Sequence, residues 1–368
     1  MLGRDLGGSS TRLRNLPGRA KRRRTVTPTV SVILPVYNGA LFLGEAVESI
    51  LGQTFDDFEL IAIDDGSVDE TALILDGYTD PRINRLKNDR NLGLTLTLNR
   101  GLDAATGTFI ARLDADDVAA VDRLATQVAF LDAHPEIGIA GSACKRIDTT
   151  GRDLGGRNVP ISDLDIRWWI LLGNPFFHST VMVRKELLDR HGLRYDGSFP
   201  TAQDYELWAR VLEKTKGANL SEPLVSLRIH DSAISAKKQR SQKGNHARVA
   251  LREIGGLWPD HPFDRQTFDE LHAIVSGASE SKGGMARKAC LDALIDLFER
   301  FQSRHETETG LADLRRRAVK EIVFLALPAP LQKGMLSVLR RLIVLEPKVI
   351  GDLAPHLSDT LAQRLLRQ

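Results

Sequence analysis

Acidic side chains gather at two points of the sequence, in the runs Asp64-Asp65 and Asp114-Ala115-Asp116-Asp117. Carboxylates held close together repel one another, so such a group needs a cation, a hydroxyl-rich ligand or bulk water. A divalent cation that bridges the phosphates of a substrate fits these residues best, because magnesium and manganese prefer hard oxygen ligands. Neither a P-loop nor a G-x-G-x-x-G pattern follows the first predicted strand, which argues against P-loop nucleotide hydrolysis and dinucleotide-dependent redox chemistry.

The two acidic runs each follow a predicted strand. Apolar and β-branched residues at 29–34, 58–63, 83–86 and 108–113 predict four strands, and the residues at 40–51, from 68, and at 94–105 predict helices between them. Ser67 is expected to cap the second helix. Alternating strands and helices indicate an α/β fold with a parallel sheet. Ligands of such sheets bind at the carboxyl ends of the strands, so both acidic runs should lie at one edge.

Aspartate at a strand end also has a structural explanation, since it commonly caps a turn. That explanation would suffice for Asp64 and Asp65 alone. A second pair, Asp114 and Asp116, stands at another strand end with the same polarity. This repetition favours a ligand site over two unrelated turns.

Several strings along residues 29–235 resemble glycosyltransferase family 2. In chain order they read SVILPVYNG, QTFDDFELIAIDDGSVDET, NLGL and LDADD, followed by NPFFHST at 174–180, QDYELW at 203–208 and LRIH at 227–230. The resemblance implies a GT-A fold, which is a Rossmann-like, mostly parallel sheet flanked by helices. It also implies transfer of a sugar from a nucleotide-sugar with inversion of the anomeric centre.

For the donor, the resemblance implies contacts from segments that follow the first strands. Pro35, Tyr37 and Asn38 correspond to positions where the family places the base and the ribose. Asp65 corresponds to the carboxylate that accepts a hydrogen bond from the base, usually uracil. Arg90 corresponds to a further contact with base or phosphate. These five residues form the predicted nucleotide end of the site.

The D-x-D string extends the resemblance to the diphosphate. Asp114 is expected to contact the ribose, and Asp116 to bind the manganese or magnesium ion that bridges the diphosphate. Asp117 is expected either to cap the following helix or to take part directly. Arg228 and His230 belong to the LRIH string, which in this family ends near the diphosphate and sometimes supplies a metal ligand. The alternative for His230 is a packed core histidine.

Asp204 matches the family's catalytic base. The reaction requires one carboxylate that deprotonates an acceptor hydroxyl while the sugar–phosphate bond breaks through an oxocarbenium-like transition state. Gln203 stands where many members carry glutamate, so no second negative charge is available there. His178 fits either the site or the core. Trp168 and Trp169 could stack on an acceptor sugar, although helix packing explains them better.

The 368 residues carry a net charge of +2 that is unevenly distributed. Residues 1–24 hold eight basic residues and one acidic residue, hence +7, which leaves −5 for the rest. We expect a basic, disordered tail at 1–28, a GT-A domain at 29–235 and a helical region at 236–368. No apolar run approaches the roughly 20 residues that span a bilayer. Cys144 and Cys290 fit neither a disulfide framework nor a zinc site, which is typical of a cytosolic protein.

Together these features predict a metal-dependent, inverting glycosyltransferase of cell-envelope or exopolysaccharide synthesis. Its expected partners are a nucleotide-sugar, UDP-linked by resemblance, and a saccharide or lipid-linked saccharide acceptor; no nucleic acid is expected, and an oligomer is compatible with the sequence. The protein is expected in the cytoplasm, where its basic tail or C-terminal helices, such as the amphipathic segment 335–345, could contact the inner face of the membrane. Two alternatives stay open: a polyprenyl-phosphate glycosyl transferase and a catalytically silent nucleotide-sugar-binding protein.

Overall fold

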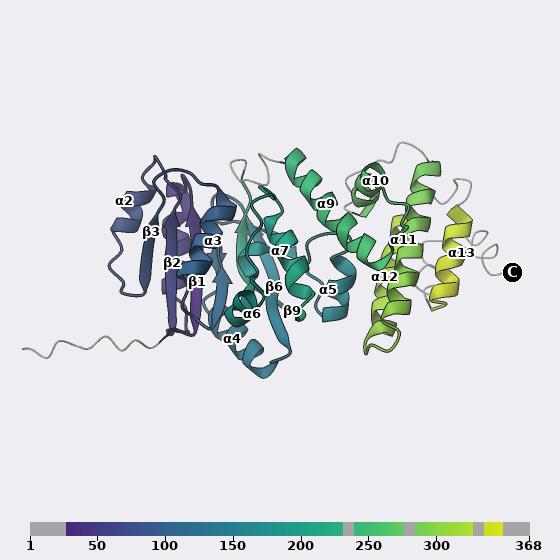
Figure 1. Cartoon of the computed structure of the whole chain (residues 1–368), viewed down its shortest axis with the longest axis horizontal. Helices are drawn as coiled ribbons and strands as arrows, with labels where there is room; N and C mark the ends of the chain where they lie inside the picture. Colours follow the sequence, from purple (N-terminus) through teal and green to yellow (C-terminus); the bar gives the residue numbers. More distant parts are fainter. Residues whose placement is uncertain (1–26, 231–238, 276–283, 327–334, 349–368) are drawn as a thin grey trace, which may run out of the picture.

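A computed structural model of the chain describes residues 27–230, 239–275, 284–326 and 335–348 (Figure 1). Nearly all of the predicted tail at 1–28, the predicted boundary near residue 235 and the end of the chain lie outside these ranges. Cys144 and Cys290 are both buried free thiols. No helix in the described ranges combines the length and the apolar character that crossing a membrane requires.

One mixed, mostly parallel sheet organises the first part of the described chain. Its strands are β1 (Val30–Val36), β2 (Phe58–Asp64), β3 (Ile83–Lys87), β4 (Phe109–Arg112), β5 (Val118–Ala119), β6 (Ile137–Ile147), β7 (Asp153–Arg157), β8 (Met182–Arg184) and β9 (Lys216–Arg228). They follow the order β3-β2-β1-β4-β8-β6-β9-β5, with β7 paired to β6. The first four are parallel neighbours, β8 runs antiparallel between β4 and β6, and β9 is parallel to β6. The four predicted strands therefore form the parallel half.

β1 continues past its expected end because Pro35 does not terminate it. Pro35 pairs with Ile63 of β2, and the strand runs on to Val36. The pairing of β1 with β4 stops at Ile33, so the N–H that Pro35 lacks is not needed by a neighbouring strand. The prediction that Pro35 follows the first strand is wrong, since its side chain is buried within the sheet.

Both faces of the sheet are buried at its central strands, and β1 shows how its residues divide between the two faces. Val32 and Leu34 belong to the core shared with helices α1 (Ala40–Leu51) and α4 (Arg123–Ala133). Ile33 belongs to the opposite core, shared with α3 (Leu94–Ala104). Strands buried on both faces read as continuous apolar runs, which explains why they were visible in the sequence.

The helix predicted from residue 68 begins later, as α2 (Thr71–Asp76). Its N-cap residue, Glu70, makes no capping hydrogen bond, and the amide of Thr71 donates to Asp69 Oδ1 at 3.1 Å. The Ser67 hydroxyl instead accepts a hydrogen bond from the Asn38 amide at 2.9 Å. The amide of Ser67 donates to Asp64 Oδ1 at 2.8 Å. Ser67 therefore ties the end of β2 to the end of β1.

Helices continue the fold beyond the sheet (Figure 1). Between strands lie α5 (Asp163–Trp169), α6 (Lys185–Arg190) and α7 (Gln203–Leu212); after β9 come α9 (Gln239–Leu257), α10 (Arg265–Val275), α11 (Gly284–Arg304), α12 (Leu311–Ala326) and α13 (Met335–Leu345). Trp168 packs against Phe298 and Phe301 of α11, with ring centroids 4.9 and 5.5 Å apart. Helix packing thus accounts for Trp168. The amphipathic segment 335–345 is α13, and its apolar side joins the same core.

Candidate active site

Three carboxylates of the D-x-D loop lie together beyond the end of β4. Oxygen atoms of Asp114, Asp116 and Asp117 come within 4.8 Å of one another. Ser179, in the 3-10 helix His178–Thr180, organises them: its hydroxyl lies 2.9 Å from Asp114 Oδ2 and 2.5 Å from Asp117 Oδ2. The same hydroxyl accepts a hydrogen bond from the Asp114 amide at 3.0 Å. The acidic residues of this strand end are therefore one cluster in space.

Asp117 supports the interior of this loop. It is 5% exposed, and its Oδ1 accepts a hydrogen bond from the Arg228 amide at 2.9 Å. Burial and the charges of Asp114 and Asp116 raise the pKa of Asp117 well above its ordinary value. The prediction that Asp117 caps the next helix is wrong, because β5 intervenes and α4 begins only at Arg123.

His230 lies against Asp116. Its Nε2 is 2.8 Å from Asp116 Oδ2, and its ring contacts Phe42 with centroids 5.3 Å apart. Burial and the charge of Asp114 raise the pKa of Asp116, while His230 acts in the opposite direction. Raised pKa values at Asp116 and Asp117 reflect desolvation and repulsion, which a divalent cation would relieve. Carboxylate oxygens with one imidazole nitrogen are a donor set that suits manganese or magnesium.

The guanidinium of Arg228 is used inside the protein. It donates to the carbonyl oxygens of Asp116 at 2.9 Å and Asp148 at 3.1 Å. It also pairs with the carboxylate of Glu45 and stacks over the Phe42 ring at 4.5 Å. With only 5% of the residue exposed, this arrangement makes Arg228 a support for the Asp116 backbone. It differs from the diphosphate contact expected from the sequence.

Asp65 anchors the loop that follows β3. Its Oδ1 accepts hydrogen bonds from Asn88 Nδ2 at 2.7 Å and from the Leu92 amide at 2.8 Å, and its Oδ2 accepts from the Gly93 amide at 3.0 Å. A carboxylate offers about four acceptor positions, so one remains for a ligand. Oδ2 of the adjacent Asp64 is buried and has no hydrogen-bond partner among the described residues. Both carboxylates at the end of β2 therefore keep acceptor capacity.

The turn after β2 touches the loop that carries Arg90. Gly66 has a φ of +71°, and a Cβ atom on it would lie 2.4 Å from the carbonyl carbon of Arg90, so glycine is required there. The side chains of Arg90, Tyr37 and Asn38 are exposed. Asn38 Oδ1 accepts a hydrogen bond from the Val68 amide at 2.9 Å, which joins the first two strand ends. These residues gather at one edge of the sheet with the carboxylates that end β2.

Asp204 is the second residue of α7. Its Oδ2 accepts a hydrogen bond from Asn174 Nδ2 at 2.7 Å. His178 Nε2 and Tyr195 Oη lie 2.9 Å apart, and the charges of Asp114 and Asp204 act on both groups. Burial lowers the pKa of His178 to about 4, so its ring is neutral at pH 7. The segment 174–179 therefore contacts both sides of the site, because Asn174 binds Asp204 and Ser179 binds Asp114 and Asp117.

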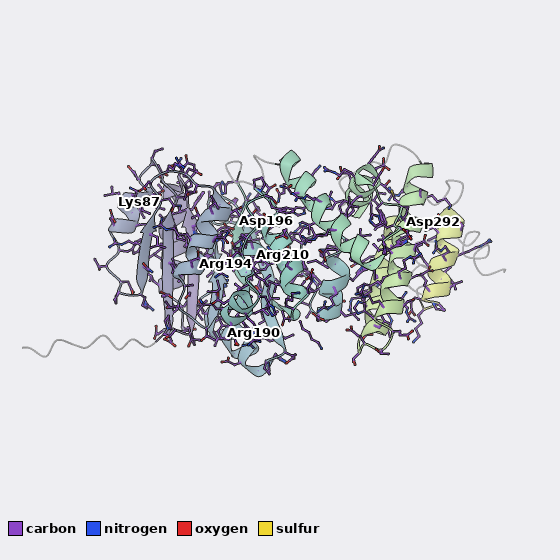
Figure 2. All side chains as sticks on the ribbon, viewed as in Figure 1. Lys87, Arg190, Arg194, Asp196, Arg210 and Asp292 are labelled. Atoms are coloured by element: carbon purple, nitrogen blue, oxygen red, sulfur yellow. The ribbon has the colours of Figure 1, made fainter. Side chains whose placement is uncertain are left out.

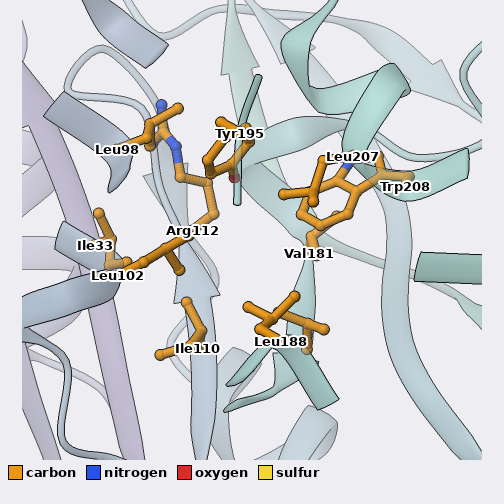
Figure 3. Close-up of a pocket in the computed structure, with 11 residues that line it drawn as sticks. Ile33, Leu98, Leu102, Ile110, Arg112, Val181, Leu188, Tyr195, Leu207 and Trp208 are labelled. Atoms are coloured by element: carbon orange, nitrogen blue, oxygen red, sulfur yellow. The ribbon is translucent and has the colours of Figure 1, made fainter. Parts of the chain in front are cut away.

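Two buried arginines beneath the D-x-D loop escaped the sequence analysis. Arg112 is 3% exposed and pairs with Asp114, yet its Nε and Nη1 find no acceptor in the part of the chain that the structure describes. Its stem lines a small apolar cavity of about 10 Å³ with Leu98 and Tyr195 (Figure 3). Arg123 is fully buried and donates to the Arg112 carbonyl at 2.8 Å. A basic residue inside the apolar run 108–113 was the signal for Arg112.

Known proteins resemble this chain in sequence. Residues 31–192 match a family model described as glycosyl transferase family 2. A Haemophilus influenzae protein named as an uncharacterized glycosyltransferase is 31% identical over 237 residues, which cover 62% of this chain and 73% of that protein. The amylovoran biosynthesis glycosyltransferase AmsE of Erwinia amylovora is 29% identical over 216 residues, which cover 56% of this chain and 79% of that protein.

A solved structure resembles the chain in fold. Residues 1–349 of Staphylococcus aureus TarS, in complex with UDP-GlcNAc, superpose with a TM-score of 0.53 over 88% of this chain and 92% of that one. The sequence identity is 18%, so this likeness concerns the fold alone. It confirms the predicted α/β architecture of GT-A type.

Proposed function

This chain belongs to glycosyltransferase family 2, and from that membership we propose that it transfers a sugar from a UDP-sugar to a hydroxyl of a saccharide or lipid-linked saccharide, with inversion at the anomeric carbon. The observation that carries the proposal is that one short segment, 174–179, binds both Asp204, through Asn174, and the D-x-D loop, through Ser179. The relative named for amylovoran biosynthesis supports a role in exopolysaccharide or cell-envelope synthesis.

The donor nucleotide is assigned to the edge formed by the ends of β1 and β2. Asp65 has one acceptor position left, which suits an N–H of the base. Tyr37 offers an exposed ring for stacking, and Asn38 and Arg90 offer exposed polar groups for the ribose and phosphates. Pro35 is assigned a supporting part, because it is buried in β1 behind these side chains.

A divalent cation, manganese or magnesium, is assigned to Asp116 and His230. Asp114 and Asp117 add to the negative charge of this cluster, and Asp114 is also assigned to the ribose. When bound, the ion would neutralise charge that develops on the departing diphosphate. Arg228 would hold the Asp116 backbone in place during the reaction.

Asp204 is assigned as the general base. Its carboxylate would take the proton of the acceptor hydroxyl as the oxygen bonds to the anomeric carbon, while the bond from that carbon to the diphosphate breaks with its electron pair. Asn174 would orient the carboxylate through Oδ2, which leaves Oδ1 for the proton. Attack on the face opposite the leaving group gives inversion without a covalent enzyme intermediate.

We place the reaction in the cytoplasm, at the inner face of the membrane when the acceptor is lipid-linked. The eight basic residues of 1–24 support contact with anionic headgroups, at about 1 kcal/mol for each one near the surface. Arg340, on the exposed side of α13, supports a second contact. Sedimentation with anionic vesicles should therefore weaken when residues 1–24 are removed, and unchanged sedimentation would exclude the tail as an anchor.

The assignment of Asp204 is tested with Asp204→Asn, which keeps the shape of the side chain. Transfer is assayed with manganese and a panel of nucleotide-sugars, and donor binding is measured by calorimetry. We expect kcat to fall by about 10²- to 10⁴-fold, the usual contribution of general base catalysis, with the donor Kd unchanged. Glu213→Gln, an exposed carboxylate at the other end of α7, is the matched control and should retain wild-type kcat.

Three results would redirect the proposal. Full activity of Asp204→Asn would favour a phosphate acceptor such as a polyprenyl phosphate, which needs no base. Nucleotide-sugar binding by the unaltered protein without any turnover would favour a silent binding protein. Activity that survives chelation would contradict the cation assigned to Asp116 and His230.

A further inference from the structure

The turn that leads into the Asp204 helix adopts an unfavourable conformation. Ala202, the residue before α7, has φ 58° and ψ 22°, which is left-handed backbone that residues other than glycine rarely adopt. As the N-cap residue, Ala202 has no side-chain acceptor and makes no capping hydrogen bond to α7. Such conformations persist where surrounding contacts hold them in place. The position of Asp204, two residues further on, therefore depends on groups outside α7.

Helix α9 supplies one of these contacts. Asn245 Nδ2 donates to the Thr201 carbonyl at 3.1 Å and lies 2.9 Å from the Thr201 hydroxyl. Thr201 is 4% exposed and directly precedes the left-handed Ala202. The Asn245 side chain of the helical region therefore binds the backbone directly before the left-handed residue.

A second contact from α9 reaches the first turn of α7 itself. The Glu206 side chain is 3% exposed, and its carboxylate pairs with Arg252 of α9 at 2.9 Å and with Arg210 of α7 at 2.6 Å. Tyr205 is fully buried and its ring contacts His246 of α9, with centroids 5.3 Å apart. Asn245, His246 and Arg252 therefore bind three successive parts of the segment 201–206.

The opposite side of the turn is held by the sheet domain. Asn99 of α3 exchanges two hydrogen bonds of 2.9 Å with the backbone of Tyr195. Arg210 of α7 donates to the carbonyl of Arg194 at 2.7 Å, and Figure 2 labels the two arginines next to each other. The segment before Asp204 is thus held by both α3 and α9, and of these two helices α9 binds the residues nearer to Asp204 in the sequence.

We propose that Asn245 and Arg252 of α9 are positioning residues for Asp204. Through these two residues the helical region sets the distance between the base and the donor. It does so without touching the D-x-D loop, because among the described residues of the sheet domain Asn245 and Arg252 contact only Thr201 and Glu206 there. The inference rests on the proposed function of Asp204 as a base. Displacements of about 1 Å at a catalytic group can cost about 100-fold in rate, so a loosened first turn should be detectable in kcat.

The test combines Asn245→Ala with Asp204→Asn in a double-mutant cycle. Asn245→Ala alone should lower kcat by about 10- to 100-fold, with the donor Kd unchanged by calorimetry. In the Asp204→Asn background the same change should lower kcat by less than about twofold, because the group it positions is already inactive. Arg252→Met should behave like Asn245→Ala and provides a second variant should the first fold poorly.

Arg317→Ala is the matched control. Arg317 of α12 pairs with Asp165 of α5, so this variant also removes a contact between the helical region and the sheet domain, but one that does not reach α7. Its kcat should stay at the wild-type value. Equal losses of kcat in Asn245→Ala and Arg317→Ala would overturn the proposal, since they would indicate a general loss of folded enzyme.

The outcomes separate this inference from the proposed function. If Asp204→Asn is fully active, Asp204 is not the base and both fail. If Asp204→Asn is inactive while Asn245→Ala and Arg252→Met keep wild-type kcat, only the positioning role fails. If Asn245→Ala lowers kcat by the same factor in the wild type and in Asp204→Asn, the positioning role is also contradicted. Asn245 would then act independently of Asp204.

Discussion

Replacing Arg228 with methionine distinguishes a support for the D-x-D loop from a ligand of the donor. Methionine fills a similar volume but cannot donate to the carbonyl oxygens of Asp116 and Asp148. Hydrogen bonds from a charged donor contribute about 1.5–3 kcal/mol each. The stacking on Phe42 adds about 0.5–2 kcal/mol. The lost contacts are partly compensated by methionine packing, so we expect the free energy of unfolding to fall by about 2–4 kcal/mol.

Urea denaturation followed by fluorescence measures this change, and calorimetry measures the donor Kd in parallel. Glu45→Gln is the control, because Glu45 is the exposed partner of Arg228 and an ion pair of this kind is worth less than about 1 kcal/mol. A loss below 1 kcal/mol in Arg228→Met, together with a donor Kd weakened tenfold or more, would refute the reasoning. It would restore Arg228 as a direct contact of the diphosphate.

Two further changes test other parts of the fold. Gly66→Ala should weaken the donor Kd at least tenfold, because its Cβ would meet the Arg90 backbone at 2.4 Å; Gly151→Ala, with φ +84° and open space around it, is the control and should leave the Kd unchanged in calorimetry. Burial lowers the pKa of His246 from 6.5 to about 4, so the unfolded chain binds this proton first as the pH falls. Stability should decline from pH 6.5 towards pH 4, by up to about 3 kcal/mol from His246, and urea denaturation of His246→Gln should show a shallower decline; equal slopes would contradict this.

Three strands of the parallel half, β1, β2 and β4, could be predicted from the sequence because they are buried on both faces. Such strands appear as short apolar runs, and their ends are marked by Asp64 and Asp114. Asp204 was identified by its motif alone, and it lies at the second position of α7. The local sequence pattern was sufficient to predict a residue's place where that place depends only on its own strand or helix.

Contacts between distant segments could not be predicted in this way. Arg228 holds Asp116 across 112 residues of sequence, and Asn245 holds Thr201 across 44, yet nothing in the local pattern of either residue indicates its partner. Asp117 illustrates the same limit, since its neighbours suggested a helix cap while its partner proved to be Ser179. Pairing partners depend on the path of the chain, which single-sequence patterns do not encode.

β9 connects the two halves of the site along one strand. It begins at Lys216, shortly after the helix of Asp204, and ends at Arg228, which grips the loop of Asp116. Successive residues of a strand point to opposite faces, so an insertion or deletion of one residue here would turn Arg228 away from its targets. Length changes among relatives of this chain should therefore fall outside the segment 204–228. A chimera that grafts a new acceptor region onto this scaffold should preserve the residue count from 204 to 228.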